Sequence, residues 1–233
     1  MAGDALVGID WPAIGEALDR EGWARLPGLL APETARALAR LWDEASFRSR
    51  VIMARHGYGQ GEYRYFDRPL PPLVAALRAQ LYPPLARIAN LWQLALRRPL
   101  RFPATLAGLA RRCRAAGQSK PTPLLLDYGA GDFNCLHQDV YGEVFFPLQA
   151  AVLLSRPGED FAGGEFILVE QRPRQQSRPM VVPLAQGDAV IFAGRERPRS
   201  GKRGVHRVAL RHGVSTVLSG HRRMLGLIFH DAR

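Results

Sequence analysis

The chain has 233 residues, 47% of them hydrophobic and 23% charged, which is typical of one globular domain with a sizeable core. No apolar run is long enough to span a bilayer, so we expect no membrane-spanning helix. The net charge is +11, and all basic residues except Lys120 and Lys202 are arginines.

Two cysteines, Cys113 and Cys135, are too few for a disulfide framework, so we expect no disulfide-linked partner. The first fifteen residues lack a basic segment before an apolar one, so we expect no signal peptide. These features together favour a cytoplasmic protein with no membrane partner.

The N-terminal half of the sequence is predicted to be mainly helical. Between two of the helical segments, residues 55–72 are rich in Gly, Tyr and Arg, which indicates a loop or a short hairpin. Pro83 and Pro84 predict an interruption in the long third helix. Apolar residues at helical spacing predict helices over 11–23, 31–45, 71–98 and 105–117.

From about residue 122 the pattern changes to short apolar or alternating runs, separated by turn signals such as PGED, AGG and AQGD. Many short strands with regular turns predict a β-sandwich or barrel. We therefore expect an α+β protein with a single domain over 1–233. Its mainly helical part would cover 1–120 and its β core 121–233.

The positive charge is concentrated in residues 171–179 and 194–212. Clustered arginines raise the local positive potential and suit phosphate or carboxylate partners. A solvated basic surface explains the same clusters, and an arginine bias can also follow from the base composition of a genome. The substrate is therefore unknown at this point, with nucleic acid as one candidate partner.

The triplet His137-Gln138-Asp139 has a spacing suited to metal binding. In an extended segment, residues two apart point to the same side, so both side chains can reach one ion. Two histidines and one carboxylate form the facial triad of non-haem Fe(II) oxygenases. The triplet alone is commonly incidental, and three downstream histidines are candidates for the third ligand: His206, His212 and His221.

The spacing that follows His212 distinguishes it from the other two. From His212 to Arg222 the chain reads H-x-V-x-x-V-x-x-G-x-R, which resembles the distal half of the Fe(II)/2-oxoglutarate dioxygenases of the prolyl-4-hydroxylase type. No such series follows His206. The resemblance implies that His137, Asp139 and His212 bind Fe(II) and are the catalytic centre. It also implies that Arg222, rather than Arg223, pairs with the far carboxylate of 2-oxoglutarate.

Further segments extend the resemblance from about residue 128 to residue 231. YGAGDFNCLHQD resembles the lead-in to the first histidine and implies that Tyr128 contacts 2-oxoglutarate, although Asn134 stands where a tyrosine is common. FAGGEFILVE and VPLAQGDAVIFAG resemble two segments between the ligand regions. The resemblance implies a double-stranded β-helix (jelly-roll) core behind an N-terminal helical layer, and O₂ as the oxidant. A turn at residues 219–220 would place the strands of His212 and Arg222 side by side.

The ending RHGVSTVLSGHRRMLGLIFHDA also resembles a family of bacterial nucleic-acid oxygenases, which are described as acting oxidatively on alkylated DNA. On this hypothesis residues 57–68 are a substrate lid, in which Tyr63 and Tyr65 stack on a base and Arg64 meets phosphate. Packing of the same aromatic residues against the β core is the alternative. Cys135 is expected to be a buried structural cysteine.

Three functions follow from the sequence. The leading hypothesis is a dioxygenase that hydroxylates or oxidatively demethylates a substrate such as alkylated nucleic acid. The second is a peptidyl-prolyl or small-molecule hydroxylase, and the third is a non-catalytic jelly-roll binding module. Nucleic-acid binding should weaken steeply with ionic strength, whereas binding of a small neutral substrate should not.

Overall fold

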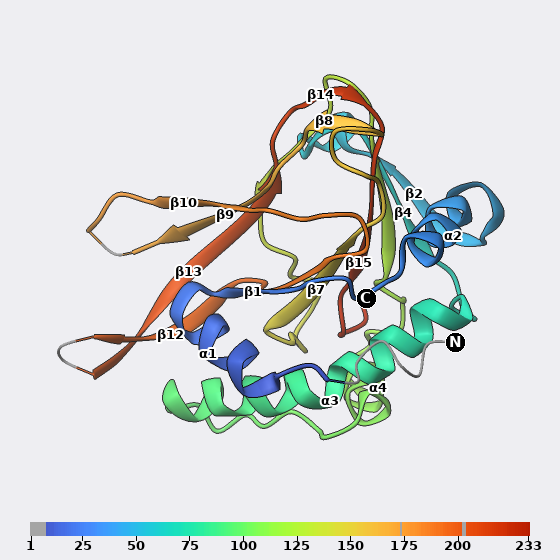
Figure 1. The fold of residues 1–233 in the computed structure, drawn as a ribbon. Helices are drawn as coiled ribbons and strands as arrows, with labels where there is room; N and C mark the ends of the chain where they lie inside the picture. The colour runs from blue at the N-terminus through green and yellow to red at the C-terminus, as the bar shows by residue number, and fades with distance from the viewer. Residues whose placement is uncertain (1–7, 173, 202–203) are drawn as a thin grey trace.

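Two antiparallel β-sheets face each other in the computed structural model and enclose most of the hydrophobic core (Figure 1). The structure describes residues 8–172, 174–201 and 204–233, so part of the segment that bears on a signal peptide lies outside it. This arrangement confirms the expected jelly-roll fold of an α+β protein.

The larger sheet is buried on both faces at its centre. Every residue of its strands β7 and β11 is buried, because helices cover the outer face while the core covers the inner one. Such strands are continuously apolar, as the runs LQAAVL and AVIFA are. In spatial order the sheet contains β1 (Trp23–Leu26), β11 (Ala189–Ala193), β7 (Leu148–Leu153), β15 (Arg222–Leu227), β5 (Leu124–Tyr128), β4 (Glu62–Phe66) and β2 (Phe47–Ile52).

The smaller sheet is organised around the long strand β13. The second half of β13 pairs with β9 and β6, and its first half forms a hairpin with β12 that projects from the body of the molecule (Figure 1). A short pair, β8 with β14, lies apart from both sheets. The strands in this part are β10 (Arg178–Val182), β9 (Phe166–Gln171), β13 (Gly204–Val214), β6 (Phe133–His137), β3 (Gly59–Gln60), β12 (Glu196–Gly201), β8 (Phe161–Gly163) and β14 (Val217–Gly220).

The predicted helices are present, and the long third one is uninterrupted. The expected break at Pro83 and Pro84 is wrong: although each proline removes a backbone donor, the neighbouring Leu81, Tyr82 and Leu85 are fully buried and hold the helix against the core. None of the described helices is both long and apolar enough to cross a membrane. The helices are α1 (Trp11–Glu21), α2 (Pro32–Glu44), α3 (Pro72–Ala95) and α4 (Leu106–Ala115), with a 3₁₀ turn over Met53–His56.

The N-terminal part also contributes four strands, and the expectation of a mainly helical region missed two of them, β1 and β2. β1 pairs with β11, and the hairpin of β2 and β4 extends the larger sheet beyond β5. Residues 55–72, expected as a loop or hairpin, contain β3 and β4. Short strands that pair with distant segments lack a local periodic signal, which is why the sequence pattern did not indicate them. That the whole chain is one domain stays a prediction.

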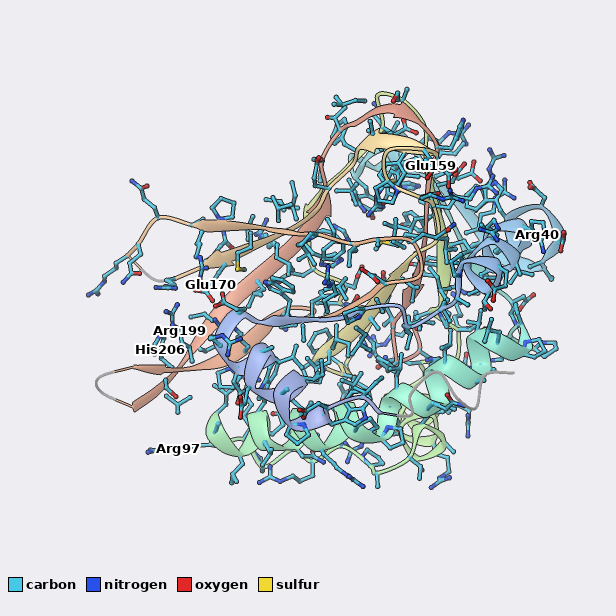
Figure 2. The ribbon with its side chains drawn as sticks, viewed as in Figure 1. Arg40, Arg97, Glu159, Glu170, Arg199 and His206 are labelled. Atoms are coloured by element: carbon cyan, nitrogen blue, oxygen red, sulfur yellow. The ribbon has the colours of Figure 1, made fainter. Side chains whose placement is uncertain are left out.

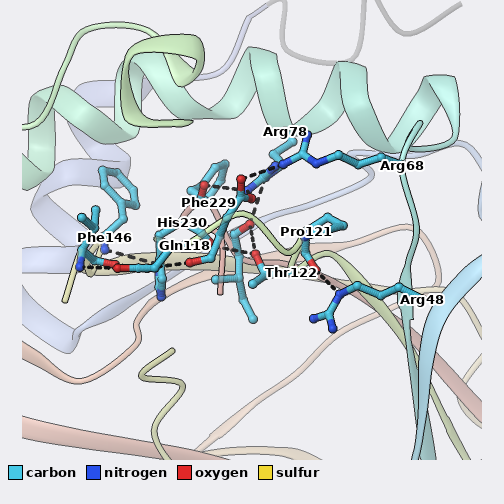
Figure 3. Close-up of polar contacts among 12 residues, drawn as sticks. Arg48, Arg68, Arg78, Gln118, Pro121, Thr122, Phe146, Phe229 and His230 are labelled. Atoms are coloured by element: carbon cyan, nitrogen blue, oxygen red, sulfur yellow. Dashed lines mark hydrogen bonds and ion pairs between the residues drawn. The ribbon is translucent and has the colours of Figure 1, made fainter. Parts of the chain in front are cut away.

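A buried arginine on α3 fixes the C-terminal segment that follows β15 (Figure 3). Arg78 is 4% exposed; its guanidinium donates to the carbonyl oxygens of Ile228 and Phe229 at 3.0 and 2.6 Å and pairs with Asp231 at 3.0 Å. The hydroxyl of Thr122 donates to the carbonyl of His230 at 2.6 Å. Asp231 also pairs with Arg68 at 2.6 Å, so two arginines and two carbonyl oxygens share the task of satisfying these buried charges.

Candidate metal centre

His137, Asp139 and His212 come together at the end of β6. Each offers one ligand atom, and these atoms all lie within 4.8 Å of one another. His137 and His212 are directly opposed residues on the antiparallel pair β6 and β13, and their ring centroids are 4.2 Å apart. Asp139 follows two residues after the end of β6. Two nitrogens and one carboxylate oxygen in this arrangement form a donor set that suits Fe(II).

The His137 ring is already oriented for metal binding. Its Nδ1 lies 2.8 Å from the carbonyl oxygen of Cys135. A carbonyl can only accept, so Nδ1 carries the proton and the lone pair of Nε2 faces the carboxylate of Asp139 at 3.6 Å. Burial lowers the pKa of His137, and the neighbouring His212 lowers it further, which favours the neutral form that binds metals.

Asp139 is held as a carboxylate. Burial alone would raise its pKa, but the hydrogen bond and charge interaction with His212, together with His137 and Tyr141, hold the pKa well below its usual range. Oδ2 lies 3.3 Å from Nε2 of His212. The other ring nitrogen of His212, Nδ1, is buried and finds no hydrogen-bond partner among the described residues.

Arg222 is a buried cation for which the described residues provide no carboxylate partner. It is 1% exposed, and in the described part of the chain neither Nε nor Nη1 has a hydrogen-bond acceptor. Its guanidinium lies 5.6 Å from the ring centre of Tyr128 and 5.9 Å from that of Phe161, and burial lowers its pKa to about 10. A buried guanidinium without an ion-pair partner destabilises the fold unless an anion binds to it. A carboxylate group of a dicarboxylate cosubstrate would be such an anion.

The structure corrects the expected relation between the strands of His212 and Arg222. They do not pair: β13 belongs to the smaller sheet and β15 to the larger one, with β14 between them in sequence. Gly220 makes this crossing possible, because its φ is 74° and a Cβ there would lie 2.0 Å from the carbonyl oxygen of Asp160. Both side chains are buried, each from its own sheet.

A cavity of about 480 Å³ opens beside the three ligands. Its walls are mainly apolar and aromatic, and no charged side chain among the described residues lines it apart from those of the triad. Three of its lining residues are exposed large hydrophobics that form the rim: Tyr58, Leu136 and Val140. Arg222 lies just behind the wall, with Nη2 3.5 Å from the sulfur of Met224, which lines the cavity.

Tyr128, the expected contact for 2-oxoglutarate, lines this cavity and is directly opposed to Arg222 on the neighbouring strand. Its hydroxyl accepts a hydrogen bond from the side-chain amide of Asn134 at 3.1 Å. Burial raises the pKa of Tyr128 to about 12, so the hydroxyl keeps its proton and can donate it to an anionic ligand.

The three residues assigned to a substrate lid separate in the structure. They belong to β4, where side chains alternate, so Tyr63 and Tyr65 line the cavity and Arg64 points to the opposite face. Arg64 lies 4.1 Å over the ring of Trp42 and pairs with Glu62 at 2.6 Å. The phosphate-binding role of Arg64 is therefore not supported by its position, and β4 is a wall of the cavity rather than a lid.

The remaining singled-out residues lie outside the triad. His206 is exposed on the β12–β13 hairpin opposite Arg199 (Figure 2), and His221 is exposed beyond β14. Cys135, expected to be buried, is exposed at the cavity, because it lies on the same side of β6 as His137.

Much of the arginine-rich second half has structural partners. The buried carboxylate of Glu170 binds three guanidinium groups, those of Arg172, Arg197 and Arg199, at 2.6, 2.5 and 2.7 Å. Figure 2 labels Glu170 and Arg199. Arg223 pairs with Asp127 at 3.0 Å. These contacts explain part of the basic clusters without any partner molecule.

Two residues near the site were missed in the sequence. Tyr141 donates to Oδ1 of Asp139 at 2.7 Å, and its position two residues after Asp139 is a signal that could have indicated it. His230 is fully buried, and its Nδ1 accepts the backbone N–H of Phe146 at 3.3 Å. No local pattern marks His230, since its burial depends on α3 and on the segment that precedes β7.

Comparisons with known proteins agree with this geometry. A family model described as "Oxygenase, catalysing oxidative methylation of damaged DNA" matches residues 61–232. Two curated relatives, the uncharacterized proteins MT2286 and Rv2227 of Mycobacterium tuberculosis, are each 48% identical over 167 residues, which is 72% of this chain and 72% of theirs.

Solved structures share the fold over nearly the whole chain. An oxidoreductase of the 2OG-Fe(II) oxygenase family from Burkholderia pseudomallei is 17% identical, with a TM-score of 0.56, covering 97% of this chain and 94% of that one. A prolyl-4-hydroxylase from Pseudomonas putida is 16% identical, with a TM-score of 0.52, covering 96% of this chain and 99% of that one. At these identities the likeness establishes the fold.

Proposed function

Because the chain belongs to this family of oxygenases, whose model covers residues 61–232, we propose that it is an Fe(II)- and 2-oxoglutarate-dependent dioxygenase acting on alkylated nucleic acid. The observation that carries the proposal is the triad of His137, Asp139 and His212 beside a cavity, with the unpaired guanidinium of Arg222 behind its wall. Fold and family together make the chain an oxidoreductase; its cofactors and substrate are the proposed part.

The residues present fit an iron ion and a dicarboxylate. His137 offers a neutral Nε2, Asp139 a carboxylate and His212 a nitrogen, so Fe(II) would be held on one face with other positions open. Arg222 would bind the far carboxylate of 2-oxoglutarate and Tyr128 would donate a hydrogen bond to it. When bound, iron, 2-oxoglutarate and O₂ supply the oxidising power to hydroxylate a C–H bond, with succinate and CO₂ as co-products.

The cavity supports a flat, uncharged or delocalised group as the part of the substrate that enters. Its aromatic wall includes Tyr63 and Tyr65, and the exposed Tyr58 lies at its rim. A nucleobase turned out of a strand requires such a pocket, with rings to contact its face. The positive net charge of +11 favours binding of the phosphate backbone.

The proposed reaction removes a methyl group. Hydroxylation of an N-methyl carbon inserts one oxygen atom into its C–H bond, and the resulting hemiaminal releases formaldehyde and leaves an N–H. No methyl donor takes part in this chemistry, so we propose demethylation as the oxidative step on damaged DNA. The chain's own side chains would position the substrate and keep bulk water from the reacting group.

Turnover with a methylated oligonucleotide tests the proposal directly. Single-stranded DNA carrying one N-methylated base is incubated with Fe(II), 2-oxoglutarate and O₂, and formaldehyde and succinate are measured against the unmethylated strand. We expect both products in equal amounts from the methylated strand, little from the matched control, and none with His212→Ala. Binding of the single strand should weaken steeply between about 50 and 200 mM salt, by roughly three-hundredfold for six phosphate contacts.

Other outcomes would favour the other functions. Coupled turnover of a proline-containing peptide, without turnover of the DNA, would favour a peptidyl hydroxylase. Failure to bind Fe(II) and 2-oxoglutarate at all would favour a non-catalytic binding module. A cytoplasmic location stays a prediction.

A further inference from the structure

Two tyrosines link Asp139 to the opposite sheet. The hydroxyl of Tyr141 lies 2.7 Å from Oδ1 of Asp139, and the hydroxyl of Tyr65 lies 2.9 Å from that of Tyr141. Tyr65 stands on β4 of the larger sheet, whereas Asp139 follows β6 of the smaller one. The contacts therefore cross the mouth of the jelly roll beside the triad, and both tyrosines line the cavity.

The direction of these hydrogen bonds is determined by the chemistry of the groups. An ionised carboxylate can only accept, so Tyr141 donates its proton to Asp139. The oxygen of Tyr141 is then left to accept, and Tyr65 must be the donor to it. Consecutive hydrogen bonds of this kind strengthen one another because each donor is polarised by the bond that it accepts.

The far end of the chain of hydroxyls is held in place as well. The guanidinium of Arg48 lies 4.3 Å over the ring of Tyr65, and its Nε donates to the carbonyl oxygen of Pro121 at 2.8 Å (Figure 3). The rings of Tyr65 and Tyr141 meet edge to face at 88°. Tyr65 is 8% exposed, so its hydroxyl is not free to turn to solvent.

We infer that Tyr141 and Tyr65 are positioning residues for the metal centre, which orient the Asp139 carboxylate so that it binds the metal through Oδ2 alone. This inference rests on the proposed function of the triad. Oδ1 accepts the hydrogen bond of Tyr141 and lies 3.6 Å from Nε2 of His137, whereas Oδ2 lies 3.3 Å from Nε2 of His212 and is the oxygen that we assign to the ion. Binding through one oxygen keeps a coordination position open, which a chelating cosubstrate and O₂ both require.

The same contacts limit what the wall offers to a substrate. We call the hydrogen-bonded series Tyr65–Tyr141–Asp139 the relay. Both tyrosine hydroxyls donate within it, so Tyr65 and Tyr141 present their rings rather than hydrogen-bond donors to a molecule in the cavity. Recognition of a base by these residues would depend on ring contacts, and loss of the Tyr65 hydroxyl would act on the metal rather than on the substrate.

Cobalt(II) titration of the metal-free protein tests the inference, because visible absorption of Co(II) reports affinity and coordination together. We expect Tyr141→Phe to bind Co(II) about 10- to 100-fold more weakly, because the carboxylate of Asp139 loses the hydrogen bond that orients it. We also expect an altered spectrum, because the freed Oδ1 can then bind the ion as well. Tyr65→Phe should give a smaller change of the same kind. In the double variant, Tyr65→Phe should add nothing, because Tyr65 acts only through Tyr141.

Tyr82→Phe is the matched control. It also removes the hydroxyl of a buried tyrosine, which donates to the carbonyl of Pro103 at 2.9 Å; Tyr82 lies on α3 and is not among the residues that line the cavity. We expect its Co(II) affinity and spectrum to equal those of the wild type. A change as large as that of Tyr141→Phe would show a general loss of stability and would overturn the inference.

The outcomes separate this inference from the proposed function. If His212→Ala binds Co(II) as tightly as the wild type, the assignment of the metal centre is wrong, and the role inferred for the relay is wrong as well. If His212→Ala loses the ion while Tyr141→Phe keeps both affinity and spectrum, the relay alone is overturned. Should Tyr141→Phe not fold, Tyr65→Phe carries the test, since an unchanged spectrum in that variant contradicts the relay.

Discussion

His137 and His212 are directly opposed on two antiparallel strands, and this pairing places their rings 4.2 Å apart. Both are therefore held by the backbone ladder of β6 and β13, which is a more rigid support than a loop. Asp139 lies beyond the end of β6, and its position depends on hydrogen bonds from its neighbours. The centre thus combines two ligands placed by the sheet with one placed by side-chain contacts.

The pairing predicts opposite results for two histidines on one strand. His212→Ala should abolish binding of Fe(II) and the uncoupled production of succinate from 2-oxoglutarate, because it removes one of three ligands. His206→Ala should keep most of both, since His206 is exposed and six residues away along β13. Anaerobic Fe(II) titration and a succinate assay measure the two effects, and the reverse result would overturn the assignment of His212.

Arg222→Met should leave the free protein at least as stable as the wild type. The substitution removes a buried charge that has no ion-pair partner among the described residues, so we expect the free energy of unfolding to be no lower than that of the wild type. With Co(II) present, 2-oxoglutarate at a hundred times its Kd should stabilise the wild type by about 2.7 kcal/mol and the variant hardly at all. Thermal unfolding with and without 2-oxoglutarate measures both.

Arg223→Met is the control for that variant. Arg223 donates to Asp127 at 3.0 Å and lies 5.6 Å from the ring of Trp42. Its loss should cost roughly 0.5–1 kcal/mol of stability and leave the response to 2-oxoglutarate intact. If Arg223→Met lost the stabilisation by 2-oxoglutarate and Arg222→Met kept it, Arg223 would be the residue that binds the far carboxylate of 2-oxoglutarate.

Short-range regularities were sufficient to predict the helices and a β-sandwich or barrel, and the resemblance to the dioxygenases named the jelly roll and pointed to these residues. The H-x-D spacing follows from the two-residue repeat of an extended chain, and the ten-residue interval from His212 to Arg222 spans a crossing that Gly220 permits. Such intervals are local. They do not, however, say which sheet each strand joins, and the expected pairing of the two strands was wrong.

Contacts between distant segments could not be predicted in the same way. Arg64 looked like a phosphate ligand because it lies between two tyrosines, but strand alternation turns it toward Trp42. The hydrogen bond between Tyr65 and Tyr141 joins residues 76 positions apart, and no local sequence pattern links them. Only the tertiary structure brings these groups together.

Gly164→Ala should weaken 2-oxoglutarate binding without affecting the metal. A Cβ at Gly164 would lie 2.8 Å from Cδ of Arg222 and 2.9 Å from Val217, so the arginine would have to move. We expect about a tenfold loss of 2-oxoglutarate affinity, roughly 1.4 kcal/mol, at unchanged Co(II) affinity. Gly158→Ala is the matched control: its φ of 81° imposes similar backbone strain, but nothing lies within 4 Å of the added carbon. Equal losses in both variants would contradict the steric argument.

His230 should make the fold sensitive to mild acid. Burial lowers its pKa to about 4 from an ordinary value of 6.5. Between these pH values the unfolded chain binds a proton at this residue and the folded chain does not, so the free energy of unfolding falls as the pH drops from about 6.5 to about 4. The shift corresponds to about 3 kcal/mol at most.

Comparison with His230→Asn isolates this contribution. An asparagine oxygen can accept the N–H of Phe146 in place of Nδ1, and asparagine does not titrate. Urea unfolding with a chelator present, at pH values from 4 to 7.5, should give a shallower pH dependence for His230→Asn than for the wild type. His206→Gln is the control, because it removes a histidine that is exposed on the β12–β13 hairpin rather than buried in the core, and it should retain the wild-type slope. Parallel curves for wild type and His230→Asn would mean that His230 is not held neutral by burial.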